Sequence, residues 1–245
     1  MFQPKRQNSS STPNRFGALS ISAAAILVLV VGVLAGPGYA TTDATDTSDA
    51  TDKVAYSITK ASSLWVVANK QRPLVPLAYK PKLASNINLA AVAAPSYALM
   101  KAAMKKAGAG TLILNSGYRS YNTQVIVHAN QVARLGLKAG EALAARPGHS
   151  EHQTGLAADV SASGQGCSIQ VCFAKTKAGK WLAANSWQYG FVLRYPDRQT
   201  KITGYQFEPW HFRYVGVQLA TEMKSQNIAT LEKFWKLPAA PSYSY

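Results

Sequence analysis

The order of apolar and polar positions along the chain predicts a mixed α and β domain. Short apolar runs bounded by glycine, proline or polar residues are typical of strands, and longer amphipathic segments are typical of helices. Strands are expected at 64–68, 111–114, 156–161, 191–195 and 210–215. Helices are expected at 94–107, 120–134, 176–188, 217–226 and 230–235, the second of them capped by Ser120. This pattern predicts an α+β fold, a small antiparallel sheet flanked by helices.

Residues 1–40 have the pattern of an export signal. Lys5, Arg6 and Arg15 form a basic flank, and an uncharged stretch rich in Ile, Leu and Val follows. The stretch ends in small residues around Ala40, which suit a signal peptidase, and it is also long enough to span a membrane. We expect a signal peptide or an N-terminal membrane anchor. Either one exports the rest of the chain, which is then secreted to the cell wall or held with its catalytic part outside the cytoplasm.

The rest of the chain divides by composition into three segments. Residues 41–60 are rich in Thr, Asp and Ala and have no apolar periodicity, which predicts a solvated linker. Residues 61–237 have a globular composition and a length that suits one domain. Residues 238–245 are expected to form a flexible tail. No repeat is visible along the sequence.

Two short segments contain the components of a hydrolytic metal site. A glycine between His152 and Asp159 lets the backbone turn, and a proline after Glu208 favours a turn that directs Glu208 and His211 into one cavity. A catalytic zinc uses three protein ligands and lowers the pKa of a bound water to about 7. We expect His152, Asp159 and His211 to bind Zn²⁺. Glu208 would remain off the metal and accept the proton of the zinc-bound water.

The sequence offers two alternatives to this metal site. Two histidines near carboxylates are more often surface or hydrogen-bonded residues than ligands, and the spacing is what favours the metal site. Ser57 and Lys60 match the S-x-x-K element of serine peptidases that cleave D-alanine peptides. No K-T-G element accompanies them, and a motif that fixes two residue types arises readily by chance. We therefore do not expect a serine mechanism.

Three motifs occur in a fixed order. They are Asn115-Ser116-Gly117-Tyr118-Arg119-Ser120 with Gln124, then Ser150-Glu151-His152-x-x-Gly155-x-Ala157-x-Asp159, and then Glu208-x-Trp210-His211. Together they resemble the zinc D-alanyl-D-alanine carboxypeptidases of the VanY type, in the group that includes lysostaphin-type peptidases and the hedgehog signalling domain. The resemblance covers residues 62–217. It implies the hedgehog/D-Ala-D-Ala-peptidase fold as a single catalytic domain, with the metal ligands and the base already named.

The same resemblance assigns roles to three further polar residues. Arg119 matches the family arginine that stabilises the polarised carbonyl or binds the terminal carboxylate of the substrate. Its planar, permanently charged guanidinium suits a carboxylate. Ser150 and Gln124 fall where the family has polar groups that contact substrate. His149 matches no residue with a family role.

The implied activity is a zinc D,D-carboxypeptidase that removes the C-terminal D-alanine from peptidoglycan stem peptides. An L,D-carboxypeptidase, a D,D-dipeptidase and a peptidoglycan endopeptidase use the same zinc site, and these alternatives remain open. A non-catalytic cell-wall-binding domain with a structural zinc belongs to a different class. Glu208 argues against that class, because a structural site closes its fourth position and needs no free base.

Cys167 and Cys172 are the only cysteines. In an exported protein this spacing predicts a disulfide that closes a small loop. A reduced pair and a second metal site are the alternatives, and no nearby histidine supports the second.

The formal net charge is +15. Nucleic acid is not an expected partner, because an exported protein rarely meets it and no motif for binding it is present. Anionic cell-wall polymers or a membrane surface suit the charge better, in addition to the stem peptides. We expect the protein to be a monomer.

Overall fold

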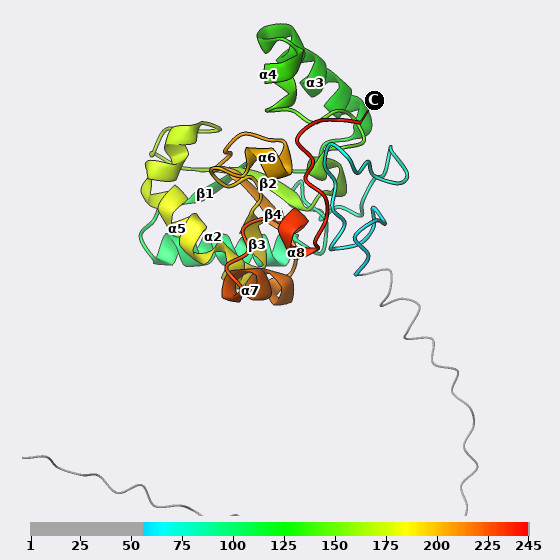
Figure 1. The fold of residues 1–245 in the computed structure, drawn as a ribbon. Helices are drawn as coiled ribbons and strands as arrows, with labels where there is room; N and C mark the ends of the chain where they lie inside the picture. Colours follow the sequence, from blue (N-terminus) through cyan, green and yellow to red (C-terminus); the bar gives the residue numbers. More distant parts are fainter. Residues whose placement is uncertain (1–55, 245) are drawn as a thin grey trace, which may run out of the picture. The chain divides into compact units, whose positions relative to one another are not determined.

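The computed structural model describes residues 56–244, and Figure 1 shows their course. They form a four-stranded antiparallel sheet with helices, which confirms the predicted α+β fold. Across the sheet, the strands are β1 (Leu112–Ser116), β2 (Ala157–Ala162), β4 (His211–Tyr214) and β3 (Phe191–Leu193). Segment 1–55, with the predicted export signal and most of the predicted linker, lies outside the described residues. Between residues 56 and 244, no helix is long and apolar enough to cross a membrane.

All five predicted helices are present. The α-helices are α2 (Ala94–Lys106), α3 (Tyr121–Leu135), α4 (Leu137–Glu141), α5 (Lys177–Asn185), α6 (Thr200–Thr203), α7 (Val217–Ser225) and α8 (Leu231–Phe234). The 3-10 helices are η1 (Glu151–Thr154), η2 (Val171–Lys175) and η3 (Ser186–Tyr189), the last of which extends α5. Ser120 caps α3 as predicted, because its hydroxyl accepts a hydrogen bond from the Thr123 backbone N–H.

The main core lies between the sheet and helix α2. Tyr97, Met100 and Met104 recur at helical spacing on α2 and are buried, and they join Val160 of β2 and Phe212 of β4 in one cluster. Figure 1 shows α2 running along the sheet, and α3 and α4 packed on each other beyond it. Because one face of the sheet is covered by this core, the site residues lie on the other face.

The predicted strand at 64–68 is wrong. The segment is irregular, although Val66, Val67 and Ala68 are buried as residues of a central strand would be. Its carbonyl groups are satisfied by a side chain, since Arg213 Nη2 donates to Leu64 O at 3.0 Å and to Val66 O at 2.9 Å. The apolar pattern reflects burial. The hydrogen bonds from Arg213 take the place of the backbone hydrogen bonds that a strand would form with a neighbouring strand.

The two ends of the described region are packed, which differs from the prediction. Ile58, assigned to the linker, packs with a buried cluster around Val67. In the segment predicted to be a flexible tail, Ala240 is 0% and Tyr243 is 6% exposed. The Tyr243 hydroxyl accepts a hydrogen bond from the Arg146 backbone N–H at 2.7 Å. The small and aromatic residues of the tail therefore bury against the domain.

Candidate metal centre and active site

The register of two central strands sets Asp159 beside His211. These residues are direct partners in the antiparallel pair of β2 and β4. Successive side chains of a strand point to opposite faces, so Ala158 and Phe212 join the core under α2 and their neighbours face away from it. The second predicted ligand and the third therefore lie together on one face of the sheet.

His152 reaches the same place from a short 3-10 helix that leads into β2. The Ser150 hydroxyl caps this helix by accepting from the His152 backbone N–H at 3.3 Å. Gly155 ends it with a φ of +67°, and a Cβ atom there would lie 2.9 Å from the backbone nitrogen of Ala90. Glycine is required at this close approach, which explains its fixed place between the two ligands.

The three predicted ligands converge with geometry suited to a metal. One ligand atom from each of His152, Asp159 and His211 lies within 4.8 Å of the others. His152 Nε2 is 3.1 Å from Asp159 Oδ2, and His211 Nδ1 is 3.1 Å from Asp159 Oδ1. The Nδ1–H of His152 donates to the Gly117 carbonyl, so Nε2 is left as an acceptor. Within residues 56–244, His152 Nε2 and Asp159 Oδ1 are buried with no hydrogen-bond partner. Two imidazoles and a carboxylate with unused acceptor atoms fit Zn²⁺.

The charges around the two histidines shift their pKa values in opposite directions. Burial and the charge of Arg119 lower the pKa of His152. Burial also opposes a proton on His211, but the nearby carboxylates of Asp159 and Glu151 outweigh it and raise the pKa of His211 to about 9. The carboxylates that hold this proton would equally stabilise a metal cation in its place, so metal binding should release protons.

Glu208 lies in the turn that precedes β4, beside the ligands. Its backbone N–H donates to Tyr195 O and its carbonyl accepts from the His211 N–H, both at 3.0 Å. Glu208 Oε2 lies 3.5 Å from His211 Nδ1. Burial raises the pKa of Glu208 to about 8, with Asp159 adding to the rise and His211 and Arg119 opposing it. A carboxyl group with a pKa near neutrality can both accept and return a proton.

Arg119 stands beside the metal site, held by its neighbours. Its Nη1 is 3.6 Å from Asp159 Oδ2 and donates to Ser116 Oγ at 3.0 Å. Its Nε donates to Gln124 Oε1 at 3.0 Å, and Gln124 Nε2 donates to the Ala145 carbonyl at 2.8 Å. The structure places Gln124, which is 0% exposed, behind Arg119 and not on the wall of the cleft. In this structure Gln124 supports the arginine, and its contact with substrate stays a prediction.

A cleft with a volume of about 210 Å³ opens above the ligands. Ser150 lines it, as expected of a substrate-contacting group, although that role stays a prediction. Helix α3 contributes Val127, Gln131 and Arg134 to one side, and Ile169 comes from the loop after β2. Arg119 and Glu208 face the same cleft. Their positions leave room for a peptide end beside the metal ligands.

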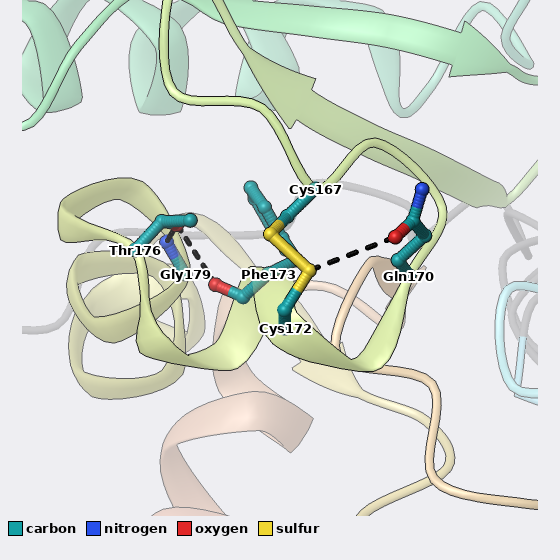
Figure 2. The surroundings of a disulfide bond; sticks show 6 residues. All are labelled: Cys167, Gln170, Cys172, Phe173, Thr176 and Gly179. Atoms are coloured by element: carbon teal, nitrogen blue, oxygen red, sulfur yellow. Dashed lines mark hydrogen bonds between the residues drawn. A yellow bond between two sulfur atoms is a disulfide. The ribbon is translucent and has the colours of Figure 1, made fainter.

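The loop that carries Ile169 is closed by a disulfide between Cys167 and Cys172, with a Cα–Cα distance of 5.5 Å. Figure 2 shows this bond beside Phe173 and the start of α5. There the Thr176 hydroxyl donates to the Phe173 carbonyl at 2.8 Å and accepts from the N–H of Gly179 at 3.0 Å. The disulfide and this cap together fix a loop that contributes to the cleft.

Sequence reasoning missed several buried residues around the ligands. Tyr195 lines the cleft, with its ring centroid 4.7 Å from that of His211. Arg194 and Arg213 are almost fully buried and both contact Glu151. Arg194 and Arg213 each lie within or beside an apolar strand pattern. A charged residue at such a position is rarely buried without a partner, and this signal could have identified both arginines.

The serine-type motif is not assembled. Ser57 Oγ accepts from the Lys60 backbone N–H in an exposed turn, and neither residue lines the cleft.

A family model described as VanY, D-alanyl-D-alanine carboxypeptidase, matches residues 86–217. The chain belongs to this family. It is 37% identical over 150 residues to a D-alanyl-D-alanine carboxypeptidase of Enterococcus faecium, a match that covers 61% of this chain and 45% of that protein. The chain thus matches less than half of that relative's length.

Two solved structures of VanY-like enzymes are similar in fold. The LdcB LD-carboxypeptidase matches with a TM-score of 0.65 and 35% identity, over 72% of this chain and 87% of that one. A vancomycin resistance D,D-pentapeptidase VanY in complex with Zn(II) matches with a TM-score of 0.60 and 32% identity, over 72% and 99%. The predicted family and fold are confirmed. Zn²⁺ is confirmed as the cofactor, because a VanY structure holds it and the candidate ligand set is present here.

Proposed function

We propose that the chain is a D,D-carboxypeptidase that removes the C-terminal D-alanine from peptidoglycan stem peptides. The observation that carries the proposal is Glu208, which is buried with its Oε2 3.5 Å from the candidate ligand His211 and lines the same cleft as Arg119. A base at the metal and a clamp for a carboxylate are what cleavage of a terminal residue requires. The D-alanyl-D-alanine carboxypeptidases among the relatives support the substrate.

Each polar residue of the cleft has a separate task in this reaction. Zn²⁺, when bound, would act as a Lewis acid that polarises the scissile carbonyl and lowers the pKa of the attacking water. Glu208 accepts the proton of that water and returns it to the leaving amine. Arg119 binds the terminal carboxylate of the peptide through its guanidinium group. Ser150 offers its hydroxyl to the peptide.

An L,D-carboxypeptidase is the second candidate, because structures of LdcB and of the L,D-carboxypeptidase DacB are similar to this chain. The two activities differ in the configuration of the residue before the cleaved bond, while the metal ligands, base and clamp would serve both. A D,D-dipeptidase or a peptidoglycan endopeptidase would use the same groups on a different bond.

The experiment that separates these candidates uses the purified, zinc-loaded protein and two stem peptides. One is a pentapeptide that ends in D-Ala-D-Ala and the other is the tetrapeptide, with products weighed by mass spectrometry. We expect the pentapeptide to lose one alanine, a chelator to abolish the loss and penicillin to leave it unchanged. Cleavage of the tetrapeptide alone would replace the proposal by the L,D activity. Cleavage of neither would refute both.

We also propose that the protein works outside the cytoplasm, attracted to anionic wall polymers. The pattern of residues 1–40 and the Cys167–Cys172 disulfide support this location, because disulfides persist in oxidising compartments. Fractionation of cells should find the protein outside the cytoplasm. Salt at about 1 M should release wall-bound protein that charge alone retains, since it shortens the range of electrostatic attraction to about 3 Å. Recovery from the cytoplasm would contradict the proposal.

A further inference from the structure

Two buried polar atoms without hydrogen-bond partners face each other behind the metal site. They are Glu151 Oε2 and His211 Nε2, and 3.7 Å separates them. Glu151 is 1% and His211 is 4% exposed, so water does not supply the missing bonds from bulk solvent. An unsatisfied buried group costs about 1–3 kcal/mol, so two such groups in apposition need an explanation.

Glu151 is fixed from its other side by two buried arginines. Its Oε1 accepts from Arg194 Nε and from Arg213 Nη1, both at 2.8 Å. Arg194 also donates from Nη1 and Nη2 to Glu232 of α8, at 2.9 and 2.7 Å. This arrangement uses one carboxylate oxygen fully and leaves Oε2 directed at His211. Burial alone would raise the pKa of Glu151, but the charges of the two arginines outweigh it and hold the group ionised.

The orientation of His211 indicates the role of Glu151 Oε2, the carboxylate oxygen that neither arginine contacts. His211 turns Nδ1 toward Asp159, at 3.1 Å, so Nδ1 is its ligand atom. A neutral imidazole that binds a metal through Nδ1 carries its proton on Nε2, the atom that faces Glu151. His152 is arranged the other way, with Nδ1–H on the Gly117 carbonyl and Nε2 toward the metal site. One ligand is thus oriented by a neutral carbonyl and the other by a carboxylate.

We propose that Glu151 is a positioning residue that accepts a hydrogen bond from the Nε2–H of His211, fixes its tautomer and strengthens it as a metal ligand. A carboxylate behind a ligating histidine raises the basicity of the ring and typically changes metal affinity 10- to 100-fold. Through Arg194 the same carboxylate connects the metal site to Glu232 on α8. This inference rests on the zinc site and is independent of which peptide bond the enzyme cleaves.

A purely structural alternative assigns Glu151 only to neutralising the buried arginines, and Glu232 provides a matched control. Glu151→Gln and Glu232→Gln each remove one negative charge from Arg194, but only the first touches His211. Zinc affinity is measured by competition with a chromophoric chelator, and unfolding of the metal-free proteins is measured beside it. We expect Glu151→Gln to weaken zinc binding by about 10- to 100-fold and Glu232→Gln to leave it near the wild-type value. Equal effects of the two variants, or an unchanged affinity in Glu151→Gln, would overturn the proposal.

A second measurement needs no variant and covers the case in which Glu151→Gln does not fold. In ¹⁵N-labelled, zinc-loaded wild-type protein, His211 should show a proton on Nε2 that is shifted downfield and exchanges slowly with water. A proton on Nδ1, or a rapidly exchanging Nε2–H, would overturn the proposal. Both readouts need only zinc, so a protein that binds zinc in this way but cleaves no stem peptide would refute the proposed function alone.

Discussion

At the scale of single residues, a variant of Arg119 tests how the cleft distinguishes the end of a peptide from its interior. If Arg119 binds the terminal carboxylate, Arg119→Gln should lower kcat/KM by about thirtyfold, since a hydrogen bond to a charged group contributes about 2 kcal/mol. The same variant should lose the preference for a free terminal carboxylate over a carboxamide. Kinetics on the two peptides measure both effects. A variant that keeps the preference would assign the carboxylate to another group.

His149 gives a prediction for pH. Its Nδ1 lies 2.8 Å from the Asn69 carbonyl, and burial lowers its pKa below the usual 6.5. The unfolded chain therefore binds a proton at His149 more readily than the folded chain does. The contribution of His149 to the free energy of unfolding is fully present above pH 6.5 and is lost as the pH falls toward the folded-state pKa. His149→Gln keeps a donor but does not titrate. The Tm advantage of wild type over this variant should shrink between about pH 7.5 and pH 5, and a constant difference would contradict the assignment.

The residue types of the site were predictable, but their supports were not. The two motifs and the turn residues predicted the candidate ligands and base, which the structure brings together, because local spacing and chemistry define them. The network around Glu151 was not visible, because its partners Arg194 and Arg213 lie 43 and 62 residues away. The support that Gln124 gives to Arg119 was not visible for the same reason, since the partner of Gln124 in the other direction, Ala145, lies 21 residues away.

At the scale of elements, apolar periodicity predicted the helices and four strands, and it failed where burial has another cause. Residues 64–68 are buried beside Arg213 without pairing in the sheet. The sequence predicts a flexible tail at 238–245, but the ring of Tyr243 in this segment contacts cationic side chains of the domain. Tyr243 packs against Arg146, 4.2 Å from the ring centroid, and against Lys70, 5.7 Å from it. Cation–π contacts of this kind leave no periodic trace in a sequence.

The packed C-terminal segment predicts a measurable contribution to stability. Tyr243→Ala should lower the free energy of unfolding by about 3 kcal/mol, because it removes a buried ring. Tyr243→Phe should lower it by about 1 kcal/mol, because it removes the hydroxyl that accepts from the Arg146 N–H and lies 3.5 Å from the Tyr205 hydroxyl. Urea unfolding of the three proteins at one pH provides the values. If both variants unfold like wild type, the segment is the flexible tail that the sequence suggested.

At the scale of the whole molecule, the two faces of the sheet have different roles: one packs the apolar core and the other carries the candidate site. The α2 face carries an apolar core, while the other face holds three ligands, a base and a buried charge network. The cost of burying those charges is met by pairing them, so the site face can be as enclosed as the core. This division explains why Asp159 and His211 lie next to the core residues Ala158 and Phe212 along two adjacent strands but on the opposite face.

The central claim is that Glu208 performs proton transfer at a zinc site whose ligands do not include it. The most direct test measures zinc content and pentapeptide cleavage together in Glu208→Ala. We predict zinc binding and unfolding like those of wild type, with kcat lower by about 10³-fold, within the range expected for the loss of a general base. Cleavage at a rate within about tenfold of wild type would contradict the role of Glu208. Loss of zinc from the variant would instead show that Glu208 helps to hold the metal.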